Sequence, residues 1–182
     1  IRQEGKMITV VGLGVEKGDL TKKGEKAILQ AAQNGEKILV RTAFTRSYEN
    51  VCELNVPHVC LDYVYENSRH FNALNKNLAK EVLKSSENAV YCVEGSAGED
   101  NSVKELLKKT KGKLQIIGGV SKISALVEKA AFKGCSYTAV SAYELLEKIE
   151  SGNIALPLIV YDLDDRALAS DCKLALLDLL GE

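Results

Sequence analysis

The chain has 182 residues, of which 46% are hydrophobic and 27% charged, and its formal net charge is −1. This balance is typical of a folded protein of one large or two small domains, and it excludes disordered, collagen-like and coiled-coil chains. A basic excess that would attract nucleic acid or an anionic membrane is missing, so neither is expected as a partner.

The cysteines, the histidines and the start of the chain indicate the cellular location and the kinds of site that we expect. Five cysteines are scattered without a C-x-x-C pair, which indicates reduced thiols and a cytoplasmic protein. His58 and His70 have no Cys or His at ligand spacing, so no metal site is expected. The sequence contains neither an apolar run long enough for a membrane span nor a recognisable leader. Met7 is the first natural start, and residues 1–6 are interpreted as an expression remnant or an upstream segment.

The first part of the chain alternates strands with helices. β-branched apolar runs predict strands, and apolar residues at helical spacing predict helices. In chain order we expect a strand at 7–14, a helix at 20–34, a strand at 37–41, a short helix at 45–54, a strand at 57–61, a long helix at 65–85, a strand at 88–93 and a helix at 101–110.

The second part continues the alternation with shorter elements. We expect strands at 114–117, 137–141 and 156–161, and helices at 121–132, 143–150 and 167–180. This order predicts an α/β fold with parallel-rich sheets and flanking helices. The Lys- and Gly-containing stretch at 108–113 interrupts the pattern. We therefore predict an N-terminal α/β domain at 7–112 and an incomplete C-terminal α/β domain at 113–182.

Glycine-rich turns follow three of the predicted strands, at 12–18, 94–98 and 117–121. In open α/β sheets, ligands bind beyond the carboxyl ends of the strands, and glycine lets a ligand approach the backbone closely. The three turns together predict a shared cleft for a nucleoside-like ligand.

The first turn resembles a dinucleotide fingerprint but is one residue too long. Where that fingerprint needs an acidic residue for the ribose, the chain has Arg41, which is interpreted as a solvated side chain or as a contact for a 2′-phosphate. Glu16 and Asp19 beside the turn disfavour a pyrophosphate. A positively charged ligand such as a sulfonium suits these residues better.

Several segments resemble a known enzyme family. Residues 7–19, MITVVGLGVEKGD, resemble the first strand and loop of the tetrapyrrole (corrin/porphyrin) methylases. Residues 39–42 (LVRT), 61–67 (LDYVYEN) and 158–177 (LIVYDLDDRALASDCKLALL) are similar to the methylase-like domain of YabN/MazG-type proteins. That domain precedes a MazG-type nucleotide pyrophosphohydrolase.

The resemblance implies a two-domain fold, here truncated before its C-terminal hairpin, that binds S-adenosylmethionine and methylates a small-molecule or tetrapyrrole-like acceptor. A fused MazG-type domain and a homodimer are also implied. The implied cofactor-binding residues lie on the three turns and at a strand end of the second domain: Gly12, Gly14, Val15, Gly95, Ser96, Ser121, Tyr161 and Asp162.

Two departures leave the activity open. Family members carry proline at the positions of Val15 and Ala97, and this chain does not. The titratable candidates for a base that deprotonates the acceptor are Asp162, Asp164, Asp165, His58 and His70, and none is assigned a catalytic role. Two alternatives therefore stand beside the methyltransferase: a non-catalytic module that binds partners or regulates an attached pyrophosphohydrolase, and an NADP-dependent oxidoreductase that uses the first turn and Arg41.

Overall fold

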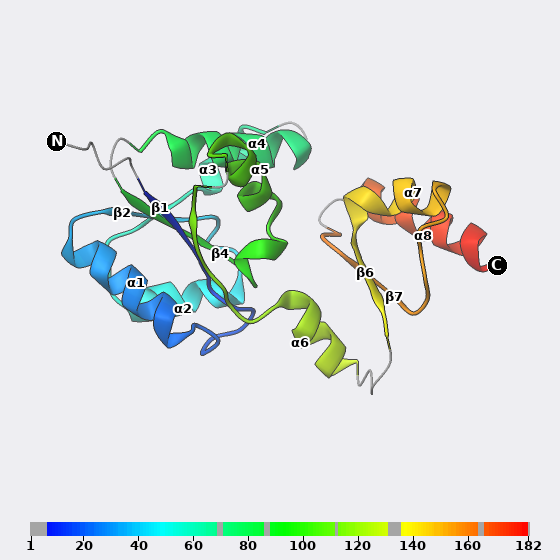
Figure 1. The fold of residues 1–182 in the computed structure, drawn as a ribbon, viewed down its shortest axis with the longest axis horizontal. Helices are drawn as coiled ribbons and strands as arrows, with labels where there is room; N and C mark the ends of the chain where they lie inside the picture. The colour runs from blue at the N-terminus through cyan, green and yellow to red at the C-terminus, as the bar shows by residue number, and fades with distance from the viewer. Residues whose placement is uncertain are drawn as a thin grey trace. The chain divides into compact units, whose positions relative to one another are not determined.

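The computed structural model describes residues 7–68, 71–85, 88–111, 113–130, 136–163 and 166–181. Contacts divide the chain into two compact units, Ile1–Ala125 and Leu126–Glu182. Figure 1 shows the elements of both units.

A five-stranded, all-parallel sheet forms the centre of the first unit, in the order β3-β2-β4-β1-β5. Its strands are β1 (Ile8–Gly12), β2 (Lys37–Val40), β3 (Val59–Cys60), β4 (Ala89–Val93) and β5 (Gln115–Ile117). Every residue of β4 is buried, as expected for a central strand covered on both faces. Because the strands are parallel, their carboxyl ends meet at one edge of the sheet.

Helices cover both faces of this sheet (Figure 1). One face packs against α1 (Lys22–Gln33) and α2 (Glu49–Glu53), and the other against α3 (Asp62–Glu66), α4 (Phe71–Leu83) and α5 (Asn101–Lys109). The 3-10 turns η1 (Arg46–Tyr48) and η2 (Ala97–Glu99) and the helix α6 (Lys122–Lys129) follow strands at the carboxyl edge.

Within α1, the sequence accounts for both ends of the helix. The Thr21 hydroxyl accepts a hydrogen bond from the Gly24 amide at 3.1 Å, which caps the first turn. After Asn34, Gly35 takes a φ of +69°, a conformation that glycine adopts easily. The buried Ile28 and Ala31 hold the apolar face of the helix against the sheet.

The second unit contains a smaller sheet of two parallel strands, β6 (Thr138–Ser141) and β7 (Leu158–Tyr161). The helices α7 (Ala142–Glu150) and α8 (Arg166–Leu180) complete it. Its core is small: among the described residues of this unit, the buried apolar ones are Val140, Ala142, Leu145, Ile159 and Cys172.

The α/β class with parallel sheets is confirmed, and two elements differ from expectation. The expected helix at 65–85 is two helices, α3 and α4, because the Asn67 and Ser68 side chains bond the Tyr63 and Val64 carbonyls and end the first. The expected strand at 57–61 shrinks to β3, since Pro57 has no N–H for the ladder.

The strand expected to start the second domain, β5, pairs with β1 and lies in the first sheet. The first compact unit runs to Ala125. The domains at 7–112 and 113–182 stay a prediction. Within the described ranges, every helix is too short or too polar to cross a bilayer.

Candidate functional site

The three glycine-rich turns meet at the carboxyl edge of the first sheet. We call them loop 1 (residues 13–21), loop 2 (94–100) and loop 3 (118–121). Gly14 and Gly95 exchange two backbone hydrogen bonds, of 3.2 and 2.8 Å, which join loops 1 and 2. A Cβ added at Gly12 would lie 2.6 Å from the Gly95 oxygen and 2.7 Å from the Gly119 nitrogen. The loops thus touch backbone to backbone, in a contact that only glycine permits.

Loop 1 is folded onto the carboxylate of Asp19. Oδ2 of Asp19 accepts hydrogen bonds from the backbone amides of Val15 at 3.0 Å and Glu16 at 2.9 Å. An anion in this loop would need these same amides, and it would meet a negative charge already in place. The sequence-based argument against a pyrophosphate here is therefore supported by the geometry.

Asn50, from α2, fixes the rest of loop 1. This side chain is only 4% exposed, and its amide nitrogen donates to the backbone oxygens of Leu13 and Glu16, both at 3.0 Å. Its amide oxygen accepts from the Gly18 amide at 2.7 Å. One buried side chain therefore holds three points of the loop.

Glu99 connects loops 2 and 3. Its carboxylate accepts hydrogen bonds from the Ser121 hydroxyl, from the Lys122 amide at 3.0 Å and from the Ser96 amide at 3.4 Å. Ser121 also accepts from the Ser124 amide at 3.0 Å, which caps the start of α6. The hydroxyl of Ser121 is therefore already engaged both as a donor and as an acceptor.

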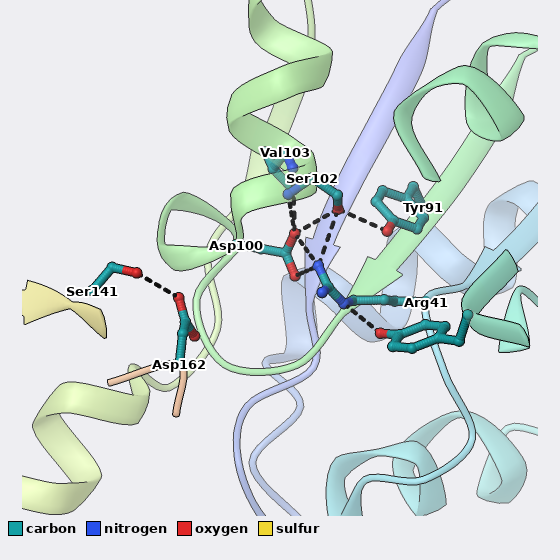
Figure 2. A network of polar contacts seen from close by, with 8 residues as sticks. Arg41, Tyr91, Asp100, Ser102, Val103, Ser141 and Asp162 are labelled. Atoms are coloured by element: carbon teal, nitrogen blue, oxygen red, sulfur yellow. Dashed lines mark hydrogen bonds and ion pairs between the residues drawn. The ribbon is translucent and has the colours of Figure 1, made fainter. Parts of the chain in front are cut away.

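Behind loop 2 lies a buried polar network, which Figure 2 shows. Nη1 of Arg41, at the end of β2, lies 2.7 Å from both carboxylate oxygens of Asp100 and 3.3 Å from the Ser102 hydroxyl. Nε of Arg41 donates to the Tyr65 hydroxyl at 2.8 Å. The Tyr91 hydroxyl lies 2.9 Å from that of Ser102 and extends the network to β4.

Asp100 also ends loop 2 and begins α5. Oδ1 accepts from the amides of Ser102 at 2.8 Å and Val103 at 3.3 Å, so Asp100 is the N-cap of the helix. The Arg41 and Asp100 side chains are only 14% and 7% exposed. Burial opposes the Arg41 charge, but Asp100 outweighs it and raises the pKa of Arg41.

The interpretation of Arg41 as a solvated residue or a 2′-phosphate contact is wrong. Its guanidinium is buried and committed to Asp100 and Tyr65. This pairing is hard to predict from the sequence, because Asp100 lies fifty-nine residues after Arg41. A weak signal is the position of Asp100 directly before the predicted helix at 101–110, since Asp is a common N-cap residue.

His58 takes no part in the contacts at this edge. His58 is a structural residue: Nδ1 lies 2.8 Å from the Val56 oxygen and Nε2 lies 2.9 Å from the Tyr48 hydroxyl. His70 lies outside the described residues. Among the residues that are described, no group of His, Cys, Asp or Glu is arranged to hold a metal ion.

The predicted site residues fall into two groups. Tyr161 and Asp162 lie in the second unit, at the end of β7. Asp162 has a φ of +61°, and one of its carboxylate oxygens lies 3.4 Å from the Ser141 hydroxyl (Figure 2). The other predicted residues gather at the carboxyl edge of the first unit: Gly12, Gly14, Val15, Gly95, Ser96 and Ser121. Sequence reasoning missed the roles of Asn50 and Asp100 beside them.

These features define an α/β protein whose parallel sheet carries three joined glycine loops at its carboxyl edge. A scan against protein-family models and a search of curated proteins find no match. Solved structures do resemble it. A conserved hypothetical protein of Aeropyrum pernix K1 is 16% identical over 75% of this chain and 47% of its own, with a TM-score of 0.49.

Two further structures carry the names of enzymes. A diphthine synthase is 19% identical over 87% of this chain and 65% of its own, with a TM-score of 0.49. The methyltransferase CobJ is 18% identical over 86% of this chain and 68% of its own, also with a TM-score of 0.49. The chain thus spans about half of the Aeropyrum protein and about two thirds of the other two.

Proposed function

We propose that this chain is a methyltransferase-like domain of the tetrapyrrole methylase type that binds S-adenosylmethionine at the carboxyl edge of its first sheet. The observation that carries the proposal is the direct contact of loops 1, 2 and 3 through Gly12, Gly95 and Gly119. Loops that are distant in the sequence but adjacent at the carboxyl edge of the sheet are typical of a ligand site in an open α/β fold.

The charges at this edge favour a ligand without phosphate groups. Asp19 occupies the loop 1 amides, and Arg41 is neutralised by Asp100. This arrangement disfavours the NADP-dependent oxidoreductase, which would need a cation for its 2′-phosphate and free amides for its pyrophosphate. A sulfonium carries its own positive charge and needs neither.

The chain's own residues would position the cofactor. Gly12, Gly14 and Val15 in loop 1, Gly95 and Ser96 in loop 2, and Ser121 in loop 3 are the proposed contacts. Tyr161 and Asp162 lie in the second unit, and their part in cofactor binding stays a prediction of the family resemblance. The cofactor, when bound, supplies an activated methyl group, so alignment matters more than covalent chemistry by the protein. The joined glycines and the Arg41–Asp100 pair would keep loops 1 and 2 in fixed positions for that alignment.

Calorimetric titration of the intact chain tests the proposal. Saturable binding of S-adenosylmethionine and S-adenosylhomocysteine, without binding of NADP, is the expected result. Ser96→Ala should weaken both, whereas Ser151→Ala, an exposed serine after α7, should leave them unchanged. Binding of NADP alone would overturn the proposal.

A second function is favoured by one observation. The Ser121 hydroxyl and the Lys122 amide, which a ligand would use, are taken by Glu99. A non-catalytic module that binds partners would not need these two donors for a ligand. The absence of any nucleoside binding would support this second function.

The methyl acceptor, the fused MazG-type domain and the homodimer are finer parts of the proposal. Reading the parent gene and measuring the mass in solution test the last two.

A further inference from the structure

Glu99 is placed where it competes with a ligand for loops 2 and 3. Its two carboxylate oxygens share three donors: the Ser121 hydroxyl, the Lys122 amide and the Ser96 amide. Ser121 and Lys122 belong to one segment, and Ser96 to another, so the carboxylate bridges two loops. The Lys122 side chain also lies against Gly95.

The chemistry of these donors matches a carboxylate from any source. A hydroxyl and two backbone amides give neutral N–H and O–H groups, and hydrogen bonds from such groups to an ionised acceptor are stronger than those between neutral partners. Oε2 of Glu99 lies 3.1 Å from the place that a Cβ on Gly95 would occupy, so the side chain lies directly over loop 2. Any ligand carboxylate that approached these donors would have to displace it.

The Glu99 side chain has room to move away from these three donors. Its side chain is half-buried rather than enclosed, and Gly98 before it has open space on its Cβ side. A carboxylate released from the three donors would therefore regain water. Asp19 in loop 1 accepts from amides three and four residues away and belongs to the turn itself. Glu99 likewise forms a local capping box with Ser96, but it also accepts from Ser121 and Lys122, twenty-two and twenty-three residues later.

We propose that Glu99 is an autoinhibitory carboxylate, which holds the donors of loops 2 and 3 until a ligand that carries its own carboxylate replaces it. This inference rests on the proposed function, because the ligand class is a nucleoside with an amino-acid tail. The carboxylate of the tail and that of Glu99 then compete for the same donors. A nucleoside without the tail does not compete.

A pair of ligands separates this effect from a general change in the site. S-adenosylhomocysteine carries the carboxylate, and 5′-methylthioadenosine is the same thionucleoside without the amino-acid end. In Glu99→Ala, we expect S-adenosylhomocysteine to bind about tenfold more tightly than to the unchanged chain, which is the worth of one charge-assisted hydrogen bond. Binding of 5′-methylthioadenosine should change by less than about twofold.

Two further variants complete the calorimetric test. Glu99→Gln keeps a neutral acceptor for the same donors and should give a smaller gain than Glu99→Ala. Glu105→Gln removes one carboxylate from α5 that pairs with Lys108, and should change neither affinity. Circular dichroism checks that each variant is folded.

The outcomes distinguish the inference from the proposed function. If both nucleosides bind and S-adenosylhomocysteine gains nothing or weakens in Glu99→Ala, the competing role is refuted and the proposed function stands. An equal gain for both ligands also refutes it. If neither nucleoside binds any variant, the proposed function fails and the inference fails with it.

Discussion

Replacing Asp100 by asparagine should destabilise the first unit by about 3 kcal/mol. Asparagine is as good an N-cap as aspartate, so α5 keeps its cap while Arg41 loses its counter-charge. Both side chains of the pair are buried, at 14% and 7% exposure. Removing one partner of a buried pair typically costs about 3–5 kcal/mol, because it leaves an uncompensated charge. The lower end applies here, since the Tyr65 hydroxyl still accepts from Nε of Arg41.

Urea unfolding followed by circular dichroism measures this loss, provided that the dependence on urea stays the same. Arg41→Met should cost a similar amount, by leaving the Asp100 carboxylate buried and unpaired. The double variant Arg41→Met with Asp100→Asn should lose at least about 1 kcal/mol less than the sum of the two single losses. Glu16→Gln is the control: it breaks an exposed pair with Arg46, which is 78% exposed, and should cost less than about 1 kcal/mol.

The reasoning would be refuted if the two single losses added to within about 0.5 kcal/mol in the double variant. Additivity would mean that Arg41 and Asp100 act independently. In that case the cap of α5, and not the ion pair, would account for the stability that Asp100 confers.

Three further predictions test the packing and the thiols. Gly12→Ala should cost at least about 2 kcal/mol in urea unfolding, because its Cβ would meet backbone atoms of loops 2 and 3, whereas Gly98→Ala, with open space around it, should be close to neutral. In the folded protein a thiol reagent should modify the exposed Cys52 and spare the buried Cys92, and modification of both at equal rates would contradict the assigned burial. Burial raises the pKa of the Cys92 thiol to about 12 from an ordinary value near 9, so the unfolded chain loses that proton first and the free energy of unfolding should fall as pH rises from 9 toward 12. Cys92→Ala should reduce that slope, measured by urea unfolding at several pH values, and an unchanged slope would contradict the shift.

The sequence alone predicts the sheet better than the polar contacts at its edge. The β-branched runs that became β1, β2 and β4 are buried on both faces, so hydrophobic pattern and burial agree there. The glycine turns were also placed correctly after strands, because strand and turn signals are local.

Contacts between residues that lie far apart in the sequence could not be predicted from it. Arg41 pairs with a residue fifty-nine positions later, and Asn50 fixes a loop more than thirty positions earlier. Nothing in the residues around Arg41 reveals which carboxylate the fold will bring to it. The break between α3 and α4 was missed for a local reason: Asn67 and Ser68 fit a helical pattern, yet their side chains capture backbone carbonyls.

The three hydrogen bonds of Asn50 have a consequence for recognition. A loop that is held by hydrogen bonds from a neighbouring helix has lost most of its conformational freedom before a ligand binds. Ligand binding to such a loop costs little conformational entropy of the backbone, so even modest contacts yield measurable affinity. An aspartate in place of Asn50 would keep the acceptor for the Gly18 amide but lose the donors to Leu13 and Glu16. Loop 1 would then have to be ordered by the ligand.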